Sequence, residues 1–335
     1  MDQAPPEVKV MEIVMGNMTS SAACALARLG VPNHLESGPK TAGELGKLVG
    51  AKPDLLERLM RATEGMGILS RTADGKWEQT PMSAALRTHS ANTMGDLAVF
   101  MADEHHARGF ASLDETVRTG EIATQRLYGV PMFEYYRNNV EAGNNFNRAM
   151  TAFSSVDVPA VIEAYDFSGI GSLTDVAGGH GLLLGAILER YPEMRGTLYE
   201  LPQVLQNMEA QWSPAVADRL ELVEGNMFES VPPGADAYIM KRILHDWPDE
   251  MCGKILSACR AGVHDGGRLI VVDAVVPSDK AFSPAKIMDL TMMLFIGGKE
   301  RTEEEFAKLF ADSGWKLNRV VPTASQLSVI EGVPA

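Results

Sequence analysis

The sequence predicts an α/β protein in which a helical, winged-helix-like region precedes a doubly wound parallel sheet. Two observations carry this prediction. Before Gly169, apolar residues recur mostly at helical spacing, whereas after it apolar runs of strand length alternate with helical stretches. Such alternation indicates parallel strands with helices on both faces of the sheet. Ligands of these sheets bind beyond the carboxyl ends of the strands.

Length, composition and charge narrow the possible classes. The 335 residues suit two domains rather than one. With 45% hydrophobic and 22% charged residues, the chain is typical of a globular protein rather than a disordered one. The net charge of −14 makes nucleic acid and anionic membranes poor partners. We expect no apolar run long enough to span a bilayer and no secretory signal at the N-terminus.

The cysteines and the paired histidines point to no metal or disulfide chemistry. Cys24, Cys252 and Cys259 form an odd, sparse set, which predicts free thiols in a reducing compartment and hence a cytoplasmic protein. His105 and His106 follow two acidic residues, but neighbours on a helix point in different directions, so no metal site is expected there.

The first 80 residues predict three helices and a hairpin. Thr41 with Glu44 three residues later forms a capping box, and Asp74-Gly75 marks the hairpin turn. This order is that of a winged helix, which often binds DNA, but charges on the third helix are balanced; we favour a dimerisation or lid function. The predicted elements are the helices Val8–Leu29, Thr41–Leu48 and Lys52–Gly65 and the strands Ile68–Arg71 and Trp77–Thr80.

Helical patterns continue from Met82 to Tyr165 and carry large apolar side chains. The simpler interpretation is core packing; the alternative is that some of them line a pocket for a planar ligand. The second half then supplies seven strands, Leu173–Val176, Thr197–Tyr199, Leu220–Val223, Ala235–Met240, Leu269–Val272, Trp315–Val321 and Leu327–Glu331, and the helices Leu182–Arg190, Pro202–Ala210 and Glu250–Val263.

A glycine loop after the first of these strands predicts an adenosine-containing cofactor. Gly178, Gly179 and Gly181 allow a sharp turn into a helix whose N-terminus favours anionic or polar ligands. Glu200 ends the second strand about 20 residues later, where an acid accepts hydrogen bonds from ribose hydroxyls. These residues alone do not distinguish a nicotinamide dinucleotide from S-adenosylmethionine. The later segments 225–228 and 240–250 favour the second, and the last places His245 at a strand end facing the cleft.

Five motifs together resemble the S-adenosylmethionine-dependent small-molecule O-methyltransferases. They are DVAGGHG at 175–181, YELP at 199–202, GNMF at 225–228, LHDWPDE at 244–250 and GGKERTEEEF at 297–306. The family includes caffeate, flavonoid and acetylserotonin O-methyltransferases and bacterial polyketide members, and the resemblance covers nearly the whole chain. It implies a Rossmann-like, seven-stranded methyltransferase domain at 169–335, a winged-helix-like dimerisation domain at 1–100, and a helical, substrate-lining region at 101–168. A homodimer is expected.

The resemblance also implies roles for individual residues. His245 is the expected general base, with Asp273 and Glu300 as the acids that flank it. The expected cofactor-binding residues are Asp175, Gly178, Gly179, Gly181, Glu200, Leu201, Asn226, Met227, Phe228 and Lys241. Three positions depart from the family pattern: Ala177 replaces a glycine, Glu200 replaces an aspartate, and Asn226 replaces another aspartate.

The chemistry favours a phenolic acceptor and needs no metal. A phenol has a pKa near 10 and a histidine near 6.5, so full proton transfer costs roughly 5 kcal/mol unless the surroundings close the gap. An aliphatic alcohol would widen this gap. A carboxylate on the second imidazole nitrogen fixes the tautomer and stabilises the imidazolium. The expected lining of the acceptor site is Met150, Phe153, Asp289, Met292, Met293 and Phe295.

Three other functions compete with methyl transfer. A family member that binds the cofactor but acts as a hydroxylase or decarboxylase would be expected to lose the base, and His245 argues against it. A nicotinamide oxidoreductase would bind a different cofactor. A winged-helix regulator with a sensory cofactor domain is the non-enzyme alternative, and it requires DNA binding with a strong salt dependence.

Overall fold

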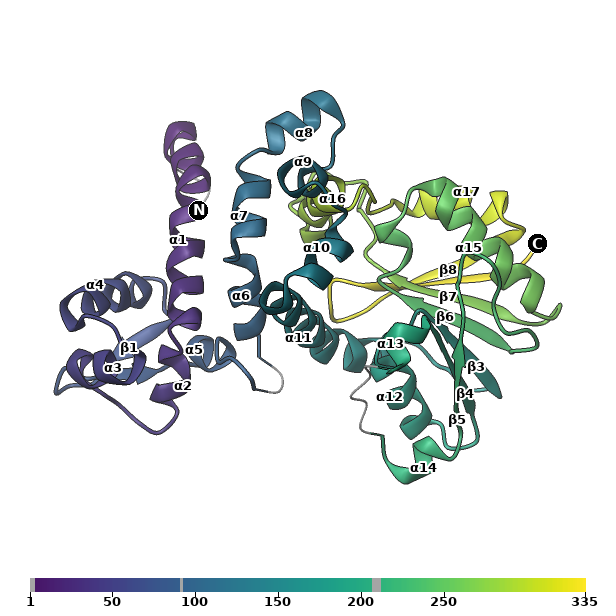
Figure 1. Ribbon diagram of the computed structural model, residues 1–335, viewed down its shortest axis with the longest axis horizontal. Coiled ribbons are helices and arrows are strands. Elements are labelled where there is room, and N and C mark those ends of the chain that lie inside the picture. Colours follow the sequence, from purple (N-terminus) through teal and green to yellow (C-terminus); the bar gives the residue numbers. More distant parts are fainter. Residues whose placement is uncertain (1–3, 91–92, 207–211) are drawn as a thin grey trace. The chain divides into compact units, whose positions relative to one another are not determined.

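The chain forms two compact units (Figure 1). In the computed structural model, which describes residues 4–90, 93–206 and 212–335, the first unit comprises Met1–Ser112 and Phe133–Ser155, and the second Leu113–Met132 and Val156–Ala335. The stretch 101–168, treated above as one helical region, therefore contributes to both units.

The first unit is built from helices and one short hairpin. Trp77 and Leu26 lie at the centre of its core and are fully buried. The predicted capping box is present, since the Thr41 side chain accepts from the Glu44 amide and Glu44 accepts from the Thr41 amide. The elements are α1 Pro6–Arg28, α2 Val31–Leu35, α3 Ala42–Val49, α4 Pro53–Glu64, β1 Leu69–Arg71, β2 Trp77–Gln79, α5 Pro81–Ala85, α6 Gly95–Met101, α7 Glu104–Phe110, α10 Met132–Asn138 and the first part of α11 Val140–Ala164.

Helix α2 was not predicted, because a glycine followed closely by a proline, as in Gly30 and Pro32, is typical of a helix end. The structure places Pro32 in the first turn of a new helix that follows Gly30 in the left-handed conformation. Proline fits this position because the first amides of a helix have no partner in the helix and the ring presets the backbone angle.

Helix α1 carries an apolar surface that faces outward. Val10, Ile13, Val14 and Met18 recur at helical spacing and are all more than half exposed. The expectation that no apolar run is long enough to span a bilayer is therefore wrong for α1, because an 18-residue window reaches a mean hydropathy of 1.2. Core helices of soluble proteins and signal sequences pass the same test, so this is weak evidence of a membrane span.

The aromatic residues of the helical region form a packed cluster in the first unit. Tyr136 stacks on Phe146 with ring centroids 4.7 Å apart, and its hydroxyl lies 3.1 Å from His105 Nδ1. Burial lowers the pKa of His105 to about 4 and that of His106 to about 3, so both imidazoles are neutral near pH 7. These contacts agree with the core-packing interpretation.

The second unit contains a seven-stranded sheet, as predicted. Its order is β5-β4-β3-β6-β7-β9-β8, in which β3 to β7 pair in parallel and β9 is antiparallel to both of its neighbours, β7 and β8. The strands are β3 Ser172–Val176, β4 Arg195–Glu200, β5 Leu220–Glu224, β6 Ala237–Lys241, β7 Arg268–Asp273, β8 Trp315–Pro322 and β9 Ser328–Pro334.

Helices pack on both faces of this sheet (Figure 1). One core gathers side chains of α12 with Leu198 and Ile270, and the other gathers side chains of α15 and α17 with Tyr238 and Val271. The helices are α8 Leu113–Thr119, α9 Ala123–Tyr128, the end of α11, α12 Leu182–Arg190, α13 Pro202–Gln206, α14 Pro214–Ala217, the 3₁₀ turn η1 Leu244–Asp246, α15 Asp249–Gly262, α16 Pro284–Phe295 and α17 Glu303–Asp312. The last residues of the predicted helix Pro202–Ala210, from 207 on, lie outside the described residues.

Candidate active site

The parallel strands bring the predicted site residues to one edge of the sheet. Strand β3 ends at the glycine loop, β4 at Glu200, β5 just before Asn226, β6 at Lys241 and β7 at Asp273. Because these strands are parallel and in register, their carboxyl ends meet at the same edge. The second unit therefore assembles residues that lie almost 100 positions apart in the chain.

The glycine loop is tightly packed against the strand below it. A β-carbon on Gly178 would overlap the Asp175 carboxylate and lie 2.6 Å from Leu198 Cδ1, so a side chain does not fit there. Gly181 is the N-cap residue of α12, and no side chain caps this helix. The first amides of α12 are thus without a capping side chain, and the helix dipole favours negative or polar ligand groups at this end.

Ala177, which replaces a glycine of the family pattern, sits in a strained conformation. Its φ of +55° lies in the left-handed region, where a β-carbon costs roughly 1–2 kcal/mol. The amide of Ala177 donates to the Tyr199 carbonyl at 2.8 Å, which holds the backbone in place. The loop therefore keeps the turn that glycine would allow without strain.

Glu200 folds its longer side chain back over the glycine loop. Its Oε2 accepts from the Gly179 amide at 3.0 Å, and its Oε1 accepts from the Leu201 amide at 2.7 Å. Burial raises the pKa of Glu200, while the two amides act in the opposite direction. The carboxylate thus links the end of β4 to the loop after β3, and Leu201 beside it is 39% exposed.

The segment after β5 forms a turn of its own. Asn226 Oδ1 accepts from the Phe228 amide at 3.1 Å, and its Nδ2 donates to Glu229 at 2.9 Å. Met227 and Phe228 pack on the α15 side of the sheet, and the Phe228 ring meets Trp247 edge-to-face at 4.8 Å. An asparagine makes both contacts, whereas an aspartate could not donate to Glu229.

Strand β6 ends in a half-buried lysine and is followed by a strained arginine. Burial lowers the pKa of Lys241, although the charges of Asp157 and Asp175 oppose this shift. Arg242 follows at a φ of +56° and donates twice to Asp157 Oδ2, both at 3.0 Å. Its amide also donates to the Val272 carbonyl. These contacts hold the turn that leads into η1.

His245 lies in η1 and is hydrogen-bonded to Glu300. Its Nδ1 is 2.8 Å from Glu300 Oε1, and Glu300 is 4% exposed. The other ring nitrogen, Nε2, lies 3.4 Å from Asp246 Oδ1. Glu300 is therefore the acid that hydrogen-bonds to the imidazole, and Asp246 is the acid nearest its other nitrogen.

The carboxylates around His245 make it a strong base. Burial disfavours the imidazolium, but the charges of Asp246, Glu300 and Asp273 outweigh burial and raise the pKa of His245 to about 9. Burial raises the pKa of Asp273 to about 7, and neither of its carboxylate oxygens has a hydrogen-bond partner among the described residues. Asp273 acts on His245 through charge, whereas Glu300 also acts through a hydrogen bond.

Helix α16 brings Asp289 to the backbone of Glu300. Asp289 Oδ1 accepts from the Glu300 amide at 2.9 Å. Met293 is half-buried, Met292 is buried, and Phe295 is fully buried with its carbonyl accepting from Thr124. Met150 and Phe153, also expected to line the acceptor site, belong to the first unit and are half-buried there.

The residues at this edge suit an adenosyl cofactor with a cationic centre. The glycine loop leaves no room for a side chain at Gly178, and Glu200 offers carboxylate oxygens beside it. Asp175 Oδ1 is buried without a hydrogen-bond partner in the described part of the chain. Burial raises the pKa of Asp175 to about 7. Hydrogen-bond acceptors at the carboxyl edge of the sheet suit the ribose hydroxyls of a cofactor. The buried acids there suit a positively charged group.

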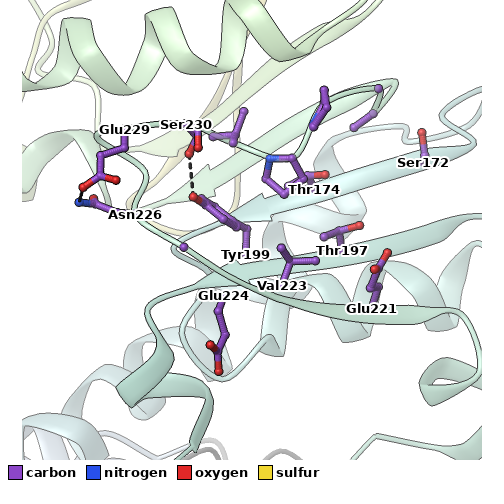
Figure 2. Close-up of a pocket in the computed structure, with 16 residues that line it drawn as sticks. Ser172, Thr174, Thr197, Tyr199, Glu221, Val223, Glu224, Asn226, Glu229 and Ser230 are labelled. Carbon is purple, nitrogen blue, oxygen red and sulfur yellow. Dashed lines mark hydrogen bonds between the residues drawn. The ribbon is translucent and has the colours of Figure 1, made fainter.

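A separate cavity of about 660 Å³ lies along the sheet rather than at this edge (Figure 2). Thr174, Thr197 and Val223 line its floor, and the Tyr199 hydroxyl donates to the Ser230 carbonyl across it. It shares Asn226 with the candidate site, but His245 and Glu300 do not line it. This cavity is therefore not the candidate active site.

Three contributors to the site were not predicted. Asp246 faces the second nitrogen of His245, Arg242 braces the turn before it, and Arg301 is buried beside the same turn. All three lie in or next to the quoted motifs, but aspartate and arginine are residue types that usually lie on the protein surface. Their closeness in the sequence to His245 or Glu300 is the one signal that could have identified them.

Replacing Ala177 with glycine should stabilise the protein. Relief of left-handed strain gains roughly 1–2 kcal/mol, and the greater freedom of glycine in the unfolded chain offsets about half of it. We expect the free energy of unfolding to rise by about 0.5–1 kcal/mol in urea titrations. Ala186→Gly, inside α12, is the matched control and should lose about 1 kcal/mol. A loss of similar size in both variants would contradict the assignment of strain.

Comparison with known proteins identifies the family. A family model described as the O-methyltransferase domain matches residues 110–316, and one described as the O-methyltransferase dimerisation domain matches residues 11–89. Phenazine O-methyltransferase PhzM of Lysobacter antibioticus is 36% identical over 97% of this chain and 95% of its own length. The mitomycin biosynthesis 6-O-methyltransferase of Streptomyces lavendulae is 34% identical over 98% and 95%.

A solved structure agrees over the full length. CalO1, a methyltransferase of calicheamicin biosynthesis in its SAH-bound form, matches with a TM-score of 0.90, 32% identity and 100% coverage of both chains. The chain that has this sheet order, this glycine loop and this His245–Glu300 pair matches these enzymes over nearly its whole length. This protein belongs to the O-methyltransferase family and joins the family's dimerisation domain to its O-methyltransferase domain.

Proposed function

We propose that the protein methylates a phenolic hydroxyl of a small aromatic molecule with S-adenosylmethionine, using His245 as the general base. Family membership establishes the reaction class and the methyl donor. The observation that carries the catalytic assignment is the hydrogen bond from His245 Nδ1 to Glu300, which leaves Nε2 to accept a proton. The CalO1 structure in its SAH-bound form supports the choice of cofactor.

The cofactor site in this proposal is the carboxyl edge of the sheet. Gly178, Gly179 and Gly181, with Asp175, hold the end of the cofactor that carries the sulfur, and Glu200 and Leu201 hold the ribose. Asn226, Met227 and Phe228 hold the adenine, and Lys241 contributes near the cofactor. When bound, S-adenosylmethionine supplies a methyl group on a positively charged sulfur that an oxygen nucleophile displaces.

The surroundings of His245 suit a phenolic acceptor because they bring the pKa of the imidazole close to that of a phenol. An isolated histidine is about 3.5 pH units less basic than a phenolate. With the pKa of His245 raised to about 9, most of this difference disappears. An aliphatic alcohol would restore a gap of several units. Glu300 and Asp273 stabilise the imidazolium that forms as the phenol loses its proton.

The proposal also assigns roles to the regions of the chain. Residues 1–100 form the dimerisation region, 101–168 contribute to the acceptor site and 169–335 bind the cofactor. On α16, Asp289, Met292, Met293 and Phe295 are proposed to contribute to acceptor binding, with Asp289 also holding the Glu300 amide. Met150 and Phe153 remain predictions for the same site. The cytoplasm is the proposed location, in line with three buried free cysteines.

A homodimer is proposed, with the outward-facing apolar surface of α1 at its interface. Four side chains on this surface are more than half exposed: Val10, Ile13, Val14 and Met18. A surface of this kind on a helix of a dimerisation domain is what an isologous partner would cover.

Replacing His245 with asparagine should abolish methylation while leaving cofactor binding near normal. Loss of a positioned base should lower kcat by about 10²–10⁴-fold. A panel of phenols with labelled S-adenosylmethionine identifies an acceptor, and calorimetry measures cofactor affinity, which should change less than about threefold. His264→Asn, at an exposed histidine that pairs with Asp236, is the control. Unchanged turnover in the His245 variant would overturn the assignment.

Replacing Glu300 with glutamine should move the pH dependence of kcat/KM toward acid. His245 must be neutral to act as a base, so activity rises as pH passes through its pKa. The charge of Glu300 helps to raise that pKa, and its removal lowers it, so the rising limb should shift to lower pH while the plateau falls. Glu303→Gln, on the exposed first turn of α17, should leave the limb in place. A limb that stays or moves to higher pH in the Glu300 variant would contradict the pairing.

Replacing Val14 with aspartate should dissociate the dimer. A charge in an apolar interface should weaken association by about 100-fold, or roughly 3 kcal/mol. Light scattering at micromolar concentration should show a dimer for the natural chain and a monomer for the variant. Leu55→Asp, at an equally apolar but separate position that is 50% exposed, should remain dimeric. Equal dissociation in both variants would remove α1 from the interface.

A further inference from the structure

Arg301 is a buried cation whose partners belong to the turn that holds His245. Its exposed fraction is 1%. Nη1 donates to the Leu244 carbonyl and Nη2 to the Trp247 carbonyl, both at 2.9 Å. Nε and Nη2 donate to Asp249 Oδ1 at 3.0 and 2.7 Å. A buried guanidinium without such partners would be strongly unfavourable, so these contacts fix its place.

The two carbonyls bracket the base in the chain. Leu244 precedes His245 and Trp247 follows it by two residues, so the planar guanidinium spans the turn from one side to the other. The turn η1 has only three residues, and its own backbone hydrogen bonds, from the Asp246 and Trp247 amides, are long at 3.2 Å. The planar guanidinium of arginine can donate to both carbonyls at once in a fixed geometry, whereas the lysine ammonium is a single point charge.

The residues just before Arg301 contact the same turn. A β-carbon on Gly298 would overlap the His245 carbonyl, so the two backbones approach as closely as glycine allows. The Lys299 amide donates to that carbonyl at 3.0 Å, and Glu300 binds the imidazole. The strip 298–301 therefore runs along η1 and contacts it at four successive positions.

We propose that Arg301 is a positioning residue that sets the distance and angle between the His245 imidazole and the Glu300 carboxylate. Glu300 is joined to Arg301 by one peptide bond, and the guanidinium anchors the backbone on both sides of His245. Movement of Arg301 thus displaces the acid and releases the turn that carries the base. A shift of about 1 Å in such an arrangement costs up to about 100-fold in rate. This inference rests on the proposed role of His245 for its effect on catalysis, but its effect on geometry is independent of that role.

The direct charge of Arg301 and its positioning effect have opposite consequences for His245. Loss of the positive charge alone would raise the pKa of the imidazole, whereas separation from Glu300 would lower it. The other charged groups around His245 are Asp246 on its own turn, Asp273 at the end of β7 and Arg242 at the end of β6. Arg301→Lys keeps the charge and removes the fork, so it isolates the positioning effect.

The test is the pKa of His245 in the free enzyme, measured by NMR of ¹⁵N-labelled histidine with His245→Asn to assign the signal. In Arg301→Lys we expect this pKa to fall by at least half a unit, the rising limb of kcat/KM to move to lower pH, and kcat to fall about 10–100-fold with the KM for S-adenosylmethionine changed less than threefold. A folded Arg301→Lys variant with the natural pKa and kcat would overturn the proposal.

Two further variants keep the test decisive. Arg260→Lys is the matched control, because Arg260 also donates to a backbone carbonyl, that of Gly314, and makes no hydrogen bond to η1 among the described residues. We expect it to leave the pKa of His245 and kcat near the natural values, and a change as large as in Arg301→Lys would also overturn the proposal. If Arg301→Lys does not fold, Arg301→Gln takes its place: because loss of the charge alone would raise the pKa of His245, a fall in this pKa would support the positioning effect and a rise would overturn it. Because the NMR readout requires no turnover, failure of His245 as the base would be seen separately, as retained activity in His245→Asn.

Discussion

The hydrogen bond between His245 Nδ1 and Glu300 Oε1 is the contact on which the site depends. Its two residues are 55 positions apart in the chain, and both are buried. Strand β6 and the turn at Arg242 position the His245 imidazole, while the strip 298–301 positions the Glu300 carboxylate. Each side is secured by backbone contacts, the Lys299 amide on one and Asp289 on the other. The acid and base therefore meet without relying on flexible side chains alone.

This contact lies in a group of carboxylates that outnumber the nearby cations. Asp246, Asp273 and Glu300 all act on His245, and burial raises the pKa of Asp246 to about 6 and that of Asp273 to about 7. Acids that hold protons near neutral pH are unfavourable for a purely structural site. They suit a site where a positively charged group arrives and where a proton must be taken up. The same excess of acid raises the pKa of His245 toward that of a phenol.

The fold was predictable where the signal is local, and less so where it is not. Apolar runs such as Leu269–Val272 marked all seven strands of the sheet, and Thr41 with Glu44 marked a helix start. Helix α2 was missed because Pro32 looks like a helix breaker, although proline in the first turn begins a helix. The insertion of β9 between β7 and β8 follows from pairing between distant segments, which no window of sequence contains.

The same reasoning explains which parts of the site were found. His245, Glu300 and the glycine loop stood out through motifs, and the structure joins His245 to Glu300 directly. Arg301 did not, because it precedes the run Glu303–Glu305 and resembles a solvated charge, yet it is among the largest fully buried side chains. Burial of a charged residue is a property of the assembled fold, since it depends on carbonyls of a turn more than 50 residues away.

Backbone strain lies at the same edge as the chemistry. Among the described residues, three that are not glycine have a positive φ, and two of them, Ala177 and Arg242, follow the neighbouring strands β3 and β6. Both are held by hydrogen bonds to an adjacent strand, from the Ala177 amide to Tyr199 and from the Arg242 amide to Val272. A relaxed turn at either place would direct the chain away from the edge. Strain of this kind persists only where surrounding contacts enforce it, and here those contacts also direct the glycine loop and His245 toward the edge where the cofactor is proposed to bind.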